Sequence, residues 1–329
     1  MNPLRVAVIG AGTFGQHHIR VISQTPGVEL WAIVDSDPQK LAELKINPVI
    51  KRFGNLDSLA GAVDAAIVAT PTHTHEAIAT RLLEAGIDVL VEKPIADSSE
   101  AGKRLSRLAE TRGRILQAGH LERFNPAVMA LDTMITVPLF FEVHRLSMFT
   151  PRSLDIDVVL DLMIHDLDIV LSMAKQMPVE IRAAGISVLS PKVDIANVRL
   201  AFPSGCIANL TASRVSTEQV RKLRVFQPGQ YISLDYARQA AVSFSIGGAD
   251  RARLGTGTTS PKIAFDPIRV EKAEPLQQEL TAFFQCVRDR TQPLVDGWEA
   301  TQVLQTAEAI IDKIKEHGDL VAETIRRQM

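Results

Sequence analysis

Short apolar runs alternate with amphipathic stretches along the first 120 residues of the chain. The apolar runs are rich in β-branched residues and short, as buried parallel strands are. Strands are predicted over Leu4–Ile9, Val28–Val34, Ala65–Ala69, Ile87–Val91 and Ile115–Ala118. Helices are predicted between them over about Thr13–Gln24, His75–Ala85 and Ser98–Arg112, the last opened by a capping sequence. This alternation predicts an α/β fold with a parallel sheet over residues 1–120.

The pattern changes after this point, because helices no longer separate most of the strands. Strands are predicted over Pro138–Phe149, Val179–Leu189, Val193–Phe202, Cys206–Ser213, Val220–Phe226 and Tyr231–Leu234, with hairpin signals such as Pro203-Ser204-Gly205 between them. Amphipathic helices are predicted over Leu276–Arg288 and Trp298–Glu316. Residues 121–329 therefore form a second, α+β domain with a largely antiparallel sheet. The stretch Gly247–Lys262 is a predicted loop, either a lid or a long hairpin connection.

Composition narrows the possible functions. A chain of 329 residues with 46% apolar residues is large enough for two domains with real cores. A net charge of −2 gives no electrostatic reason to expect a nucleic-acid or membrane partner. Two cysteines far apart give no disulfide framework and no cysteine metal motif, and they favour a reducing, cytoplasmic location. No apolar run is long enough to span a bilayer, and the first apolar stretch is a strand rather than a signal peptide.

A glycine motif, Gly10-Ala11-Gly12-Thr13-Phe14-Gly15, follows the first strand directly. Its three glycines permit a tight turn, the approach of a pyrophosphate and close packing of a helix on the strand. Asp35 ends the second strand 20 residues after Gly15, where an acid binds ribose hydroxyls. A tight turn in some other α/β protein is the alternative, but the order of strand, glycines, helix, strand and acid favours a dinucleotide-binding Rossmann domain. Asp35 and Asp37 favour NAD over NADP, whereas the hydroxyl of Ser36 leaves NADP possible.

Polar residues follow three further predicted strands, and ligands of open parallel sheets bind at the carboxyl ends of strands. These residues lie in Thr70-Pro71-Thr72-His73-Thr74-His75, in Glu92-Lys93-Pro94 and in Gly119–Arg123. We therefore expect Thr70, Pro71, His75, Glu92 and Lys93 to line the cofactor site together with the glycine motif. The alternatives are polar residues at a helix start for His73 and His75, and an ordinary surface lysine for Lys93.

One predicted helix, Asp157–Lys175, is strongly apolar apart from a few acidic and histidine residues. Asp161, His165 and Asp168 stand at positions i, i+4 and i+7, which places them on one helix face. Buried carboxylates and imidazoles are costly unless they are paired or used, so this stripe indicates a site lining. A solvent-facing stripe is one alternative and a zinc site is another. We expect no metal, because the helix has no cysteine and no second nearby histidine.

Three motifs in this order resemble the glucose–fructose oxidoreductase, inositol dehydrogenase and rhizopine-catabolism (Gfo/Idh/MocA) family. They are the glycine motif, Glu92-Lys93-Pro94 and Asp161-Leu162-Met163-Ile164-His165-Asp166-Leu167-Asp168. The resemblance covers nearly the whole chain. It implies an N-terminal Rossmann domain, a C-terminal domain with an open, mostly antiparallel sheet, and a homodimer or homotetramer formed through that sheet. It also implies NAD(P)-dependent oxidation of a sugar or polyol hydroxyl, with Lys93, Asp161 and His165 as the catalytic residues.

A narrower likeness lies in Gly119-His120-Leu121-Glu122-Arg123-Phe124-Asn125-Pro126 and Glu142-Val143-His144-Arg145. These runs are similar to a branch of the family that oxidises the 3-hydroxyl of UDP-N-acetylglucosamine-type sugar nucleotides. On this basis Arg123, Asn125, Arg145 and Asp168 are expected to bind the substrate. Arg152 and Arg214 are further candidates for the diphosphate, although each arginine can equally be structural or solvated.

The expected chemistry needs a base for the hydroxyl proton, a charge that stabilises the alkoxide and a hydride acceptor. His165 fits the role of the base and Lys93 that of the charge, while the order in which these two residues take the proton stays open. We expect both to meet Asp161 in a crevice between the domains. A sharp turn at Lys93-Pro94 suggests a cis peptide bond there. The alternative functions are a dehydrogenase of a free polyol or sugar, and a nucleotide-binding regulator without turnover. Retention of all three polar residues favours an enzyme.

Overall fold

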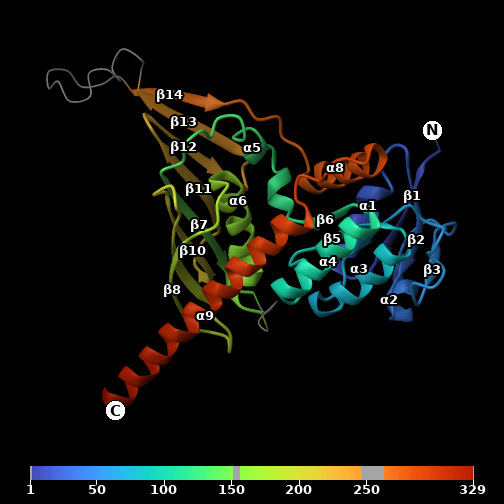
Figure 1. Cartoon of the computed structure of the whole chain (residues 1–329), viewed down its shortest axis with the longest axis horizontal. Coiled ribbons are helices and arrows are strands. Elements are labelled where there is room, and N and C mark those ends of the chain that lie inside the picture. Colours follow the sequence, from blue (N-terminus) through green and yellow to red (C-terminus); the bar gives the residue numbers. More distant parts are fainter. Residues whose placement is uncertain (1, 151–155, 247–262, 329) are drawn as a thin grey trace. The chain divides into compact units, whose positions relative to one another are not determined.

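The computed structural model describes residues 2–150, 156–246 and 263–328 (Figure 1). It divides into two compact units, Met1–Phe124 with Glu274–Gln305, and Asn125–Ala273 with Thr306–Met329. The predicted boundary between residues 120 and 121 is close to the first crossing of the chain. The second domain is not one continuous stretch, however, because residues 274–305 return to the first unit.

The first unit is built on a six-stranded sheet in the order β3-β2-β1-β4-β5-β6. All of its neighbouring strands are parallel. The strands are β1 (Leu4–Ile9), β2 (Val28–Val34), β3 (Lys51–Phe53), β4 (Ala65–Val68), β5 (Asp88–Glu92) and β6 (Leu116–Gly119). This is the strand order of a Rossmann domain, and it confirms the predicted α/β fold.

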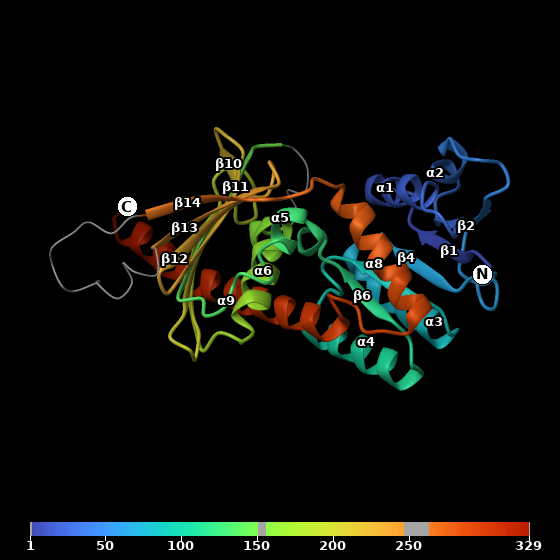
Figure 2. The same ribbon diagram turned by 90° about the horizontal axis from the view of Figure 1, so that it is seen from above.

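Helices cover both faces of this sheet. They are α1 (Thr13–Ile22), α2 (Pro38–Glu43), α3 (His75–Glu84), α4 (Ser99–Arg112) and α8 (Pro275–Asp289). On one face, Leu280, Phe283 and Phe284 of α8 share a core with β1 and α1. On the other face, α3 and α4 lie side by side (Figure 2). Three large side chains buried by α8 explain why this late segment belongs to the first unit.

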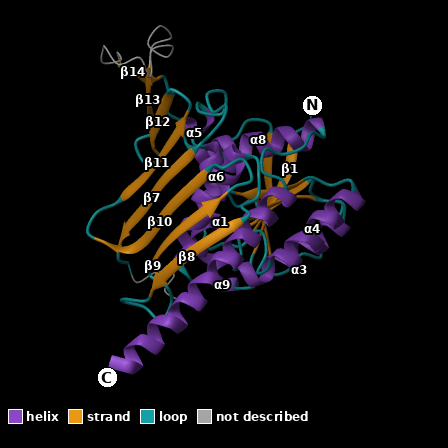
Figure 3. Cartoon of the chain, turned by 60° about the vertical axis from the view of Figure 1, so that its left-hand side comes forward, coloured by secondary structure: helices purple, strands orange, loops and turns teal. Residues whose placement is uncertain are grey.

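The second unit is built on an eight-stranded sheet in the order β14-β13-β12-β11-β7-β10-β9-β8, which forms one layer (Figure 3). The strands are β7 (Phe140–Met148), β8 (Glu180–Ile186), β9 (Ile195–Ala201), β10 (Ile207–Ser216), β11 (Val220–Gln227), β12 (Gln230–Asp235), β13 (Ala240–Ile246) and β14 (Ile263–Ile268). Only β7 and β10 pair in parallel; the other neighbours are antiparallel. The mostly antiparallel sheet is therefore confirmed, while β13 and β14 were not predicted.

Helical segments pack on one face of the second sheet (Figure 1). They are α5 (Pro126–Met129), the π-helical turn η3 (Val159–Met163) and α6 (Ile164–Ala174). The last helix, α9 (Gly297–Gln328), is longer than predicted and has residues in both units. Among the described residues, no helix has both the length and the apolar character needed to cross a membrane.

Candidate active site

The glycine motif forms the turn between β1 and α1. Gly10 has φ +101°, and a Cβ on it would lie 2.4 Å from the Ala69 carbonyl oxygen. A Cβ on Gly15 would lie 1.8 Å from the Gly10 carbonyl oxygen, so only glycine lets the helix pack this close to the turn. A Cβ on Gly12 would meet nothing within 4 Å. The loop is therefore tight on its protein side and open at Gly12, as a pyrophosphate-binding turn requires.

Asp35 lies at the carboxyl end of β2, beside this turn. One of its carboxylate oxygens accepts a hydrogen bond from the Ala11 amide at 2.7 Å, and the other accepts one from the Asp37 amide at 2.9 Å. The carboxylate is half-buried, and a carboxylate has further acceptor positions beyond these two. Its placement and acceptor capacity fit the hydroxyls of a ribose bound over the glycine motif.

The segment after β4 is held by His75. Its Nδ1 lies 2.8 Å from the Pro94 carbonyl oxygen and its Nε2 lies 2.8 Å from the Thr70 carbonyl oxygen. His75 is 1% exposed, and this burial lowers its pKa while the two carbonyl contacts act in the opposite direction. His75 thus ties the turn after β4 to the turn after β5. Direct contact with a cofactor, as the sequence predicted for His75, is not supported by this buried position, whereas Thr70 and Pro71 remain partly exposed.

The end of β5 carries a close contact between a carboxylate and a buried imidazole, next to Lys93. His18 of α1 is 0% exposed, and its Nε2 lies 2.7 Å from Oε1 of Glu92. Burial tends to raise the pKa of Glu92, but the hydrogen bond and attraction to His18, together with Lys93, outweigh it and lower that pKa. The Lys93-Pro94 peptide bond is cis, as predicted. Glu92, Lys93 and Pro94 are all half-buried at the strand end, and the Glu92 carboxylate is held by His18.

His120 follows β6, the next strand. It is 1% exposed, and burial together with the positive charges of Arg123 and Lys93 lowers its pKa to about 3. Its imidazole is therefore neutral at neutral pH. The ends of β5 and β6 thus bring Glu92, Lys93, His120 and Arg123 into one electrostatic neighbourhood, as expected for strand ends of a parallel sheet.

In the second unit, Asp161 lies in the π-helical turn η3 and His165 lies one turn later, in α6. Both side chains are partly exposed, whereas Asp168 is 1% exposed. π-Helical turns are rare and frequently occur at functional sites. The predicted stripe is therefore divided, because Asp168 belongs to the interior and only Asp161 and His165 reach the surface of this unit.

The other predicted substrate-binding residues form hydrogen bonds with residues of their own unit. The Arg123 guanidinium donates to the Leu294 carbonyl oxygen at 3.1 Å and to Glu299 at 3.3 Å. Asn125 caps α5 by accepting from the Ala127 amide at 3.1 Å, and it is 3% exposed. Arg145 is 2% exposed and forms two hydrogen bonds with Asp166, at 2.7 and 2.9 Å. These structural contacts argue against substrate binding by these side chains.

The remaining predicted residues lie outside the described ranges or belong to different units. Arg152 and the loop Gly247–Lys262 lie outside the described residues. Lys93 and the pair Asp161 and His165 belong to different units, so their meeting at one hydroxyl stays a prediction. Within the described part of the chain, no group of three or more histidine, cysteine, aspartate or glutamate residues is arranged to hold a metal ion.

Both units of the chain match models of known protein families. Residues 4–120 match the family described as "Oxidoreductase family, NAD-binding Rossmann fold", and residues 139–227 match the "GFO/IDH/MocA C-terminal domain". The chain belongs to the Gfo/Idh/MocA family of NAD(P)-dependent dehydrogenases. The resemblance seen in the three sequence motifs is thereby confirmed, as is the prediction of an enzyme.

Individual relatives show which enzymes of this family the chain is similar to. The chain is 33% identical over 311 residues to the UDP-N-acetylglucosamine 3-dehydrogenase of Acidithiobacillus ferrooxidans, with 93% of this chain and 96% of that protein covered. A solved structure of that organism's enzyme has a TM-score of 0.86 at 30% identity and covers 96% of this chain and 99% of its own. Inositol 2-dehydrogenase 1 of Saccharopolyspora erythraea is 36% identical over 165 residues, covering 45% of this chain and 49% of that protein.

A more distant relative has been solved with a bound cofactor. An oxidoreductase from Agrobacterium radiobacter, solved with NAD+, L-tartaric acid and magnesium, has a TM-score of 0.81 at 16% identity and covers 95% of this chain and 97% of its own. At this identity the likeness concerns the fold alone. The glycine motif and Asp35 nonetheless fit a dinucleotide on their own geometry, as described above.

Sequence patterns alone missed some of the polar residues around the site. His18 follows Gly15 by three residues and Ile19 follows it by four, which places His18 on the buried face of α1. A histidine on an apolar helix face was a usable signal for a buried pair. The pairing of Arg145 with Asp166 had no comparable signal, because β7 and α6 are joined only by tertiary packing.

The same substitution, glycine to alanine, should have different effects at Gly12 and at Gly15. Gly12→Ala adds a methyl group where no protein atom lies within 4 Å, so the unfolding free energy should change by less than about 1 kcal/mol. The same methyl group occupies the space expected for a pyrophosphate, so NAD affinity should fall at least roughly tenfold, about 1.4 kcal/mol. Gly15→Ala should instead destabilise the first unit by about 3 kcal/mol or more.

Thermal unfolding and calorimetric titration with NAD+ measure both quantities. Gly113→Ala is not a suitable control because Gly113 has φ +60°, whereas Gly318→Ala adds a methyl group in open space on α9, in the second unit. Normal NAD affinity in Gly12→Ala would contradict the assigned pyrophosphate position.

Proposed function

We propose that this dehydrogenase oxidises the C3 hydroxyl of UDP-N-acetylglucosamine, or of a closely related UDP-linked N-acetylhexosamine. The similarity to a UDP-N-acetylglucosamine 3-dehydrogenase over 93% of the chain carries this proposal. The similarity to an inositol 2-dehydrogenase spans only 45% of the chain. The Rossmann unit is shared by both kinds of enzyme, so similarity that extends through the second unit is the more informative for the substrate. A dehydrogenase of a free polyol or sugar is the second candidate.

In the proposed reaction, three side chains act on the substrate hydroxyl. A bound nicotinamide supplies the hydride acceptor. The positive charge of Lys93 stabilises the oxygen as it loses its proton. His165 accepts the proton, and Asp161, four residues earlier on the same helical segment, orients the imidazole or a substrate hydroxyl. The partial exposure of all three side chains is consistent with these roles.

We propose NAD, rather than NADP, as the cofactor. The Asp35 carboxylate beside the glycine motif would repel a 2′-phosphate, and Asp37 adds a second negative charge nearby. Asp35→Ala should therefore lose most of the preference for NAD, with Asp57→Ala, an exposed acid elsewhere in this unit, as the control. The ratio of the dissociation constants for NAD+ and NADP+ is the measurement. Tighter binding of NADP+ by the unmodified protein would contradict the assignment of Asp35.

We further propose that the protein is a homo-oligomer formed through the second sheet. Five aromatic residues cross neighbouring strands on the face opposite α6: Phe140, Phe226, Tyr231, Phe244 and Phe265. Their successive ring centroids are 5.9, 5.2, 4.4 and 5.1 Å apart, and Phe265 is 58% exposed. A continuous apolar row of this kind is typical of an interaction surface.

Sedimentation velocity tests this surface. The unmodified protein should sediment as a dimer or tetramer at micromolar concentration, and Tyr231→Lys with Phe244→Lys should shift it toward the monomer. A matched pair of lysine substitutions at two exposed apolar residues of the first unit, Val49→Lys with Leu294→Lys, should leave the assembly unchanged. An unmodified protein that is monomeric under these conditions would contradict the proposal.

The proposed substrate is tested by following NADH formation with purified protein. UDP-N-acetylglucosamine should support turnover with NAD+, whereas myo-inositol and glucose should not. Turnover with a free polyol or sugar, and none with any UDP-linked N-acetylhexosamine, would favour the second candidate. Absence of turnover with all of these compounds would contradict both.

The proposed side-chain roles predict the kinetics of two variants. Lys93→Met should lower kcat by ~10²–10³ through loss of a well-placed charge, while NAD affinity changes little. His165→Asn should lower kcat and remove the pH dependence that the base confers. His144→Asn, at a partly exposed histidine on the opposite sheet face, serves as the control. Near-normal turnover in either test variant would exclude that residue from the mechanism.

A further inference from the structure

The start of the helical segment that carries Asp161 and His165 is held by the end of the loop that joins β8 to β9. The Val158 amide donates to the Val193 carbonyl oxygen at 3.1 Å, and the Val193 amide donates to the Asp157 carboxylate at 3.2 Å. These two bonds join the residues just before η3 to Val193 from both sides. The position of the π-helical turn therefore depends on the position of Val193 and its neighbour Asp194.

Asp194 is a buried carboxylate with many donors. One of its oxygens accepts hydrogen bonds from the amides of Val188, Leu189 and Ser190 at 2.7, 2.6 and 3.0 Å. The other accepts from the Ser190 hydroxyl at 2.6 Å. Burial tends to raise the pKa of Asp194, but these hydrogen bonds outweigh it and lower the pKa to about 2. The carboxylate is therefore charged at neutral pH and fixed in place.

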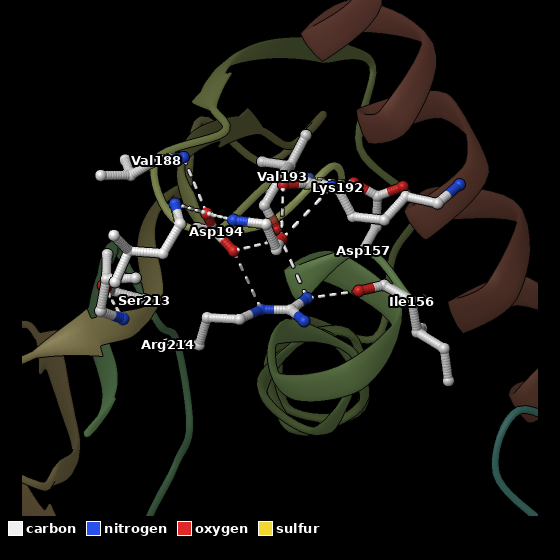
Figure 4. A network of polar contacts seen from close by, with 11 residues as sticks. Ile156, Asp157, Val188, Lys192, Val193, Asp194, Ser213 and Arg214 are labelled. Carbon is white, nitrogen blue, oxygen red and sulfur yellow. Dashed lines mark hydrogen bonds and ion pairs between the residues drawn. The ribbon is translucent and has the colours of Figure 1, made fainter. Parts of the chain in front are cut away.

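Arg214 joins this carboxylate to the start of the helical segment (Figure 4). It extends from the end of β10, is 5% exposed, and its Nε lies 3.8 Å from Asp194. Its Nη2 donates to the carbonyl oxygen of Ile156 and, at 3.4 Å, to that of Val193. One guanidinium therefore contacts the Asp194 carboxylate, the loop before β9 and a residue that precedes the helical segment.

A second buried pair holds the same segment one turn further on. Arg145 of β7 pairs with Asp166, the residue after His165, and the Arg145 guanidinium carbon lies 5.2 Å from the centroid of the Tyr236 ring. Arg145 lies opposite Ala212 in the parallel pair of β7 and β10, two residues before Arg214. Arginines from two adjacent strands thus fix the segment before Asp161 and after His165.

A π-helical turn needs such support, because its hydrogen-bond pattern is less favourable than that of an α-helix. Buried ion pairs add little net stability compared with apolar side chains of similar volume, whereas they can fix one geometry. We propose that Asp194 and Arg214 are positioning residues, which hold the π-helical turn so that Asp161 and His165 keep their working geometry. The assignment rests on the proposed roles of these two residues in the reaction.

Amide hydrogen exchange, measured without substrate, tests whether Asp194 and Arg214 hold the π-helical turn. Arg214→Lys keeps the positive charge but loses the planar guanidinium with its several hydrogen-bond donors. Amide hydrogen exchange over residues 156–165 should therefore accelerate by roughly tenfold. Exchange in β12 of the same unit should stay unchanged. Arg224→Lys is the matched control, because Arg224 forms an exposed pair with Glu142 on the other face of the sheet. It should behave as the unmodified protein.

Kinetics then test the link to the reaction. With the substrate identified, Arg214→Lys should lower kcat by roughly 10- to 100-fold, since small misplacements of reacting groups are costly, while KM for NAD+ changes less than about twofold. Asp194→Asn should behave in the same way, and it replaces Arg214→Lys in both measurements if that variant does not fold.

Three results would overturn the proposal. They are unchanged exchange over residues 156–165, acceleration that is equal throughout the second unit, and unaltered kcat despite local loosening. If the unmodified protein oxidises none of the tested compounds, the proposed function fails, whereas the exchange result still decides whether the pair holds the turn.

Discussion

The close approach of α1 to the turn after β1 is the constraint on which the first unit depends. A single methyl group on Gly15 would lie 1.8 Å from the Gly10 carbonyl oxygen, so the helix can start here only with glycine at this position. Because α1 starts here, its free amides face the open side of the loop at Gly12. The same turn presents the Ala11 amide to Asp35, which orients the acid at the end of β2.

Buried polar pairs then determine how the residues at the strand ends are held. His18 of α1 pairs with Glu92 of β5, and His75 joins the turns after β4 and β5. In the second unit, Arg145 with Asp166 and Arg214 with Asp194 do the same for the helical segment that bears Asp161 and His165. In both units the partly exposed polar residues are therefore flanked by residues whose side chains are fixed in the interior. Such support is what a site with a defined geometry requires.

Local patterns in the sequence were sufficient for most of the fold. The glycine motif, the apolar strands and Asp35 lie within one short stretch, so their spacing alone predicts the Rossmann unit. The return of α8 to the first unit was not predictable in this way, because Phe283 and Phe284 pack against strands more than 200 residues earlier. β13 and β14 were missed because they flank the predicted loop, and only the pairing of β12 with β13 and of β13 with β14 makes their register evident.

The site was only partly predictable for a related reason. Lys93, Asp161 and His165 stand in recognisable sequence motifs. The acidic residues that pair with the buried arginines stand in no such motif. Arg123, Arg145 and Arg214 all carry a charge that suits a diphosphate, and only tertiary structure shows that Glu299, Asp166 and Asp194 lie beside them. The sequence does not distinguish an arginine that binds a ligand from one that forms an internal ion pair, since both have the same local sequence pattern.

The central claim is that hydride leaves C3 of a UDP-linked N-acetylhexosamine and reaches NAD. The most direct measurement uses UDP-N-acetylglucosamine carrying deuterium at C3, with NAD+ and purified protein, followed by mass spectrometry of the nucleotide products. One deuterium is expected in the reduced cofactor, together with its loss from the sugar. Reduced cofactor without deuterium, which means that hydride came from another carbon, would contradict it.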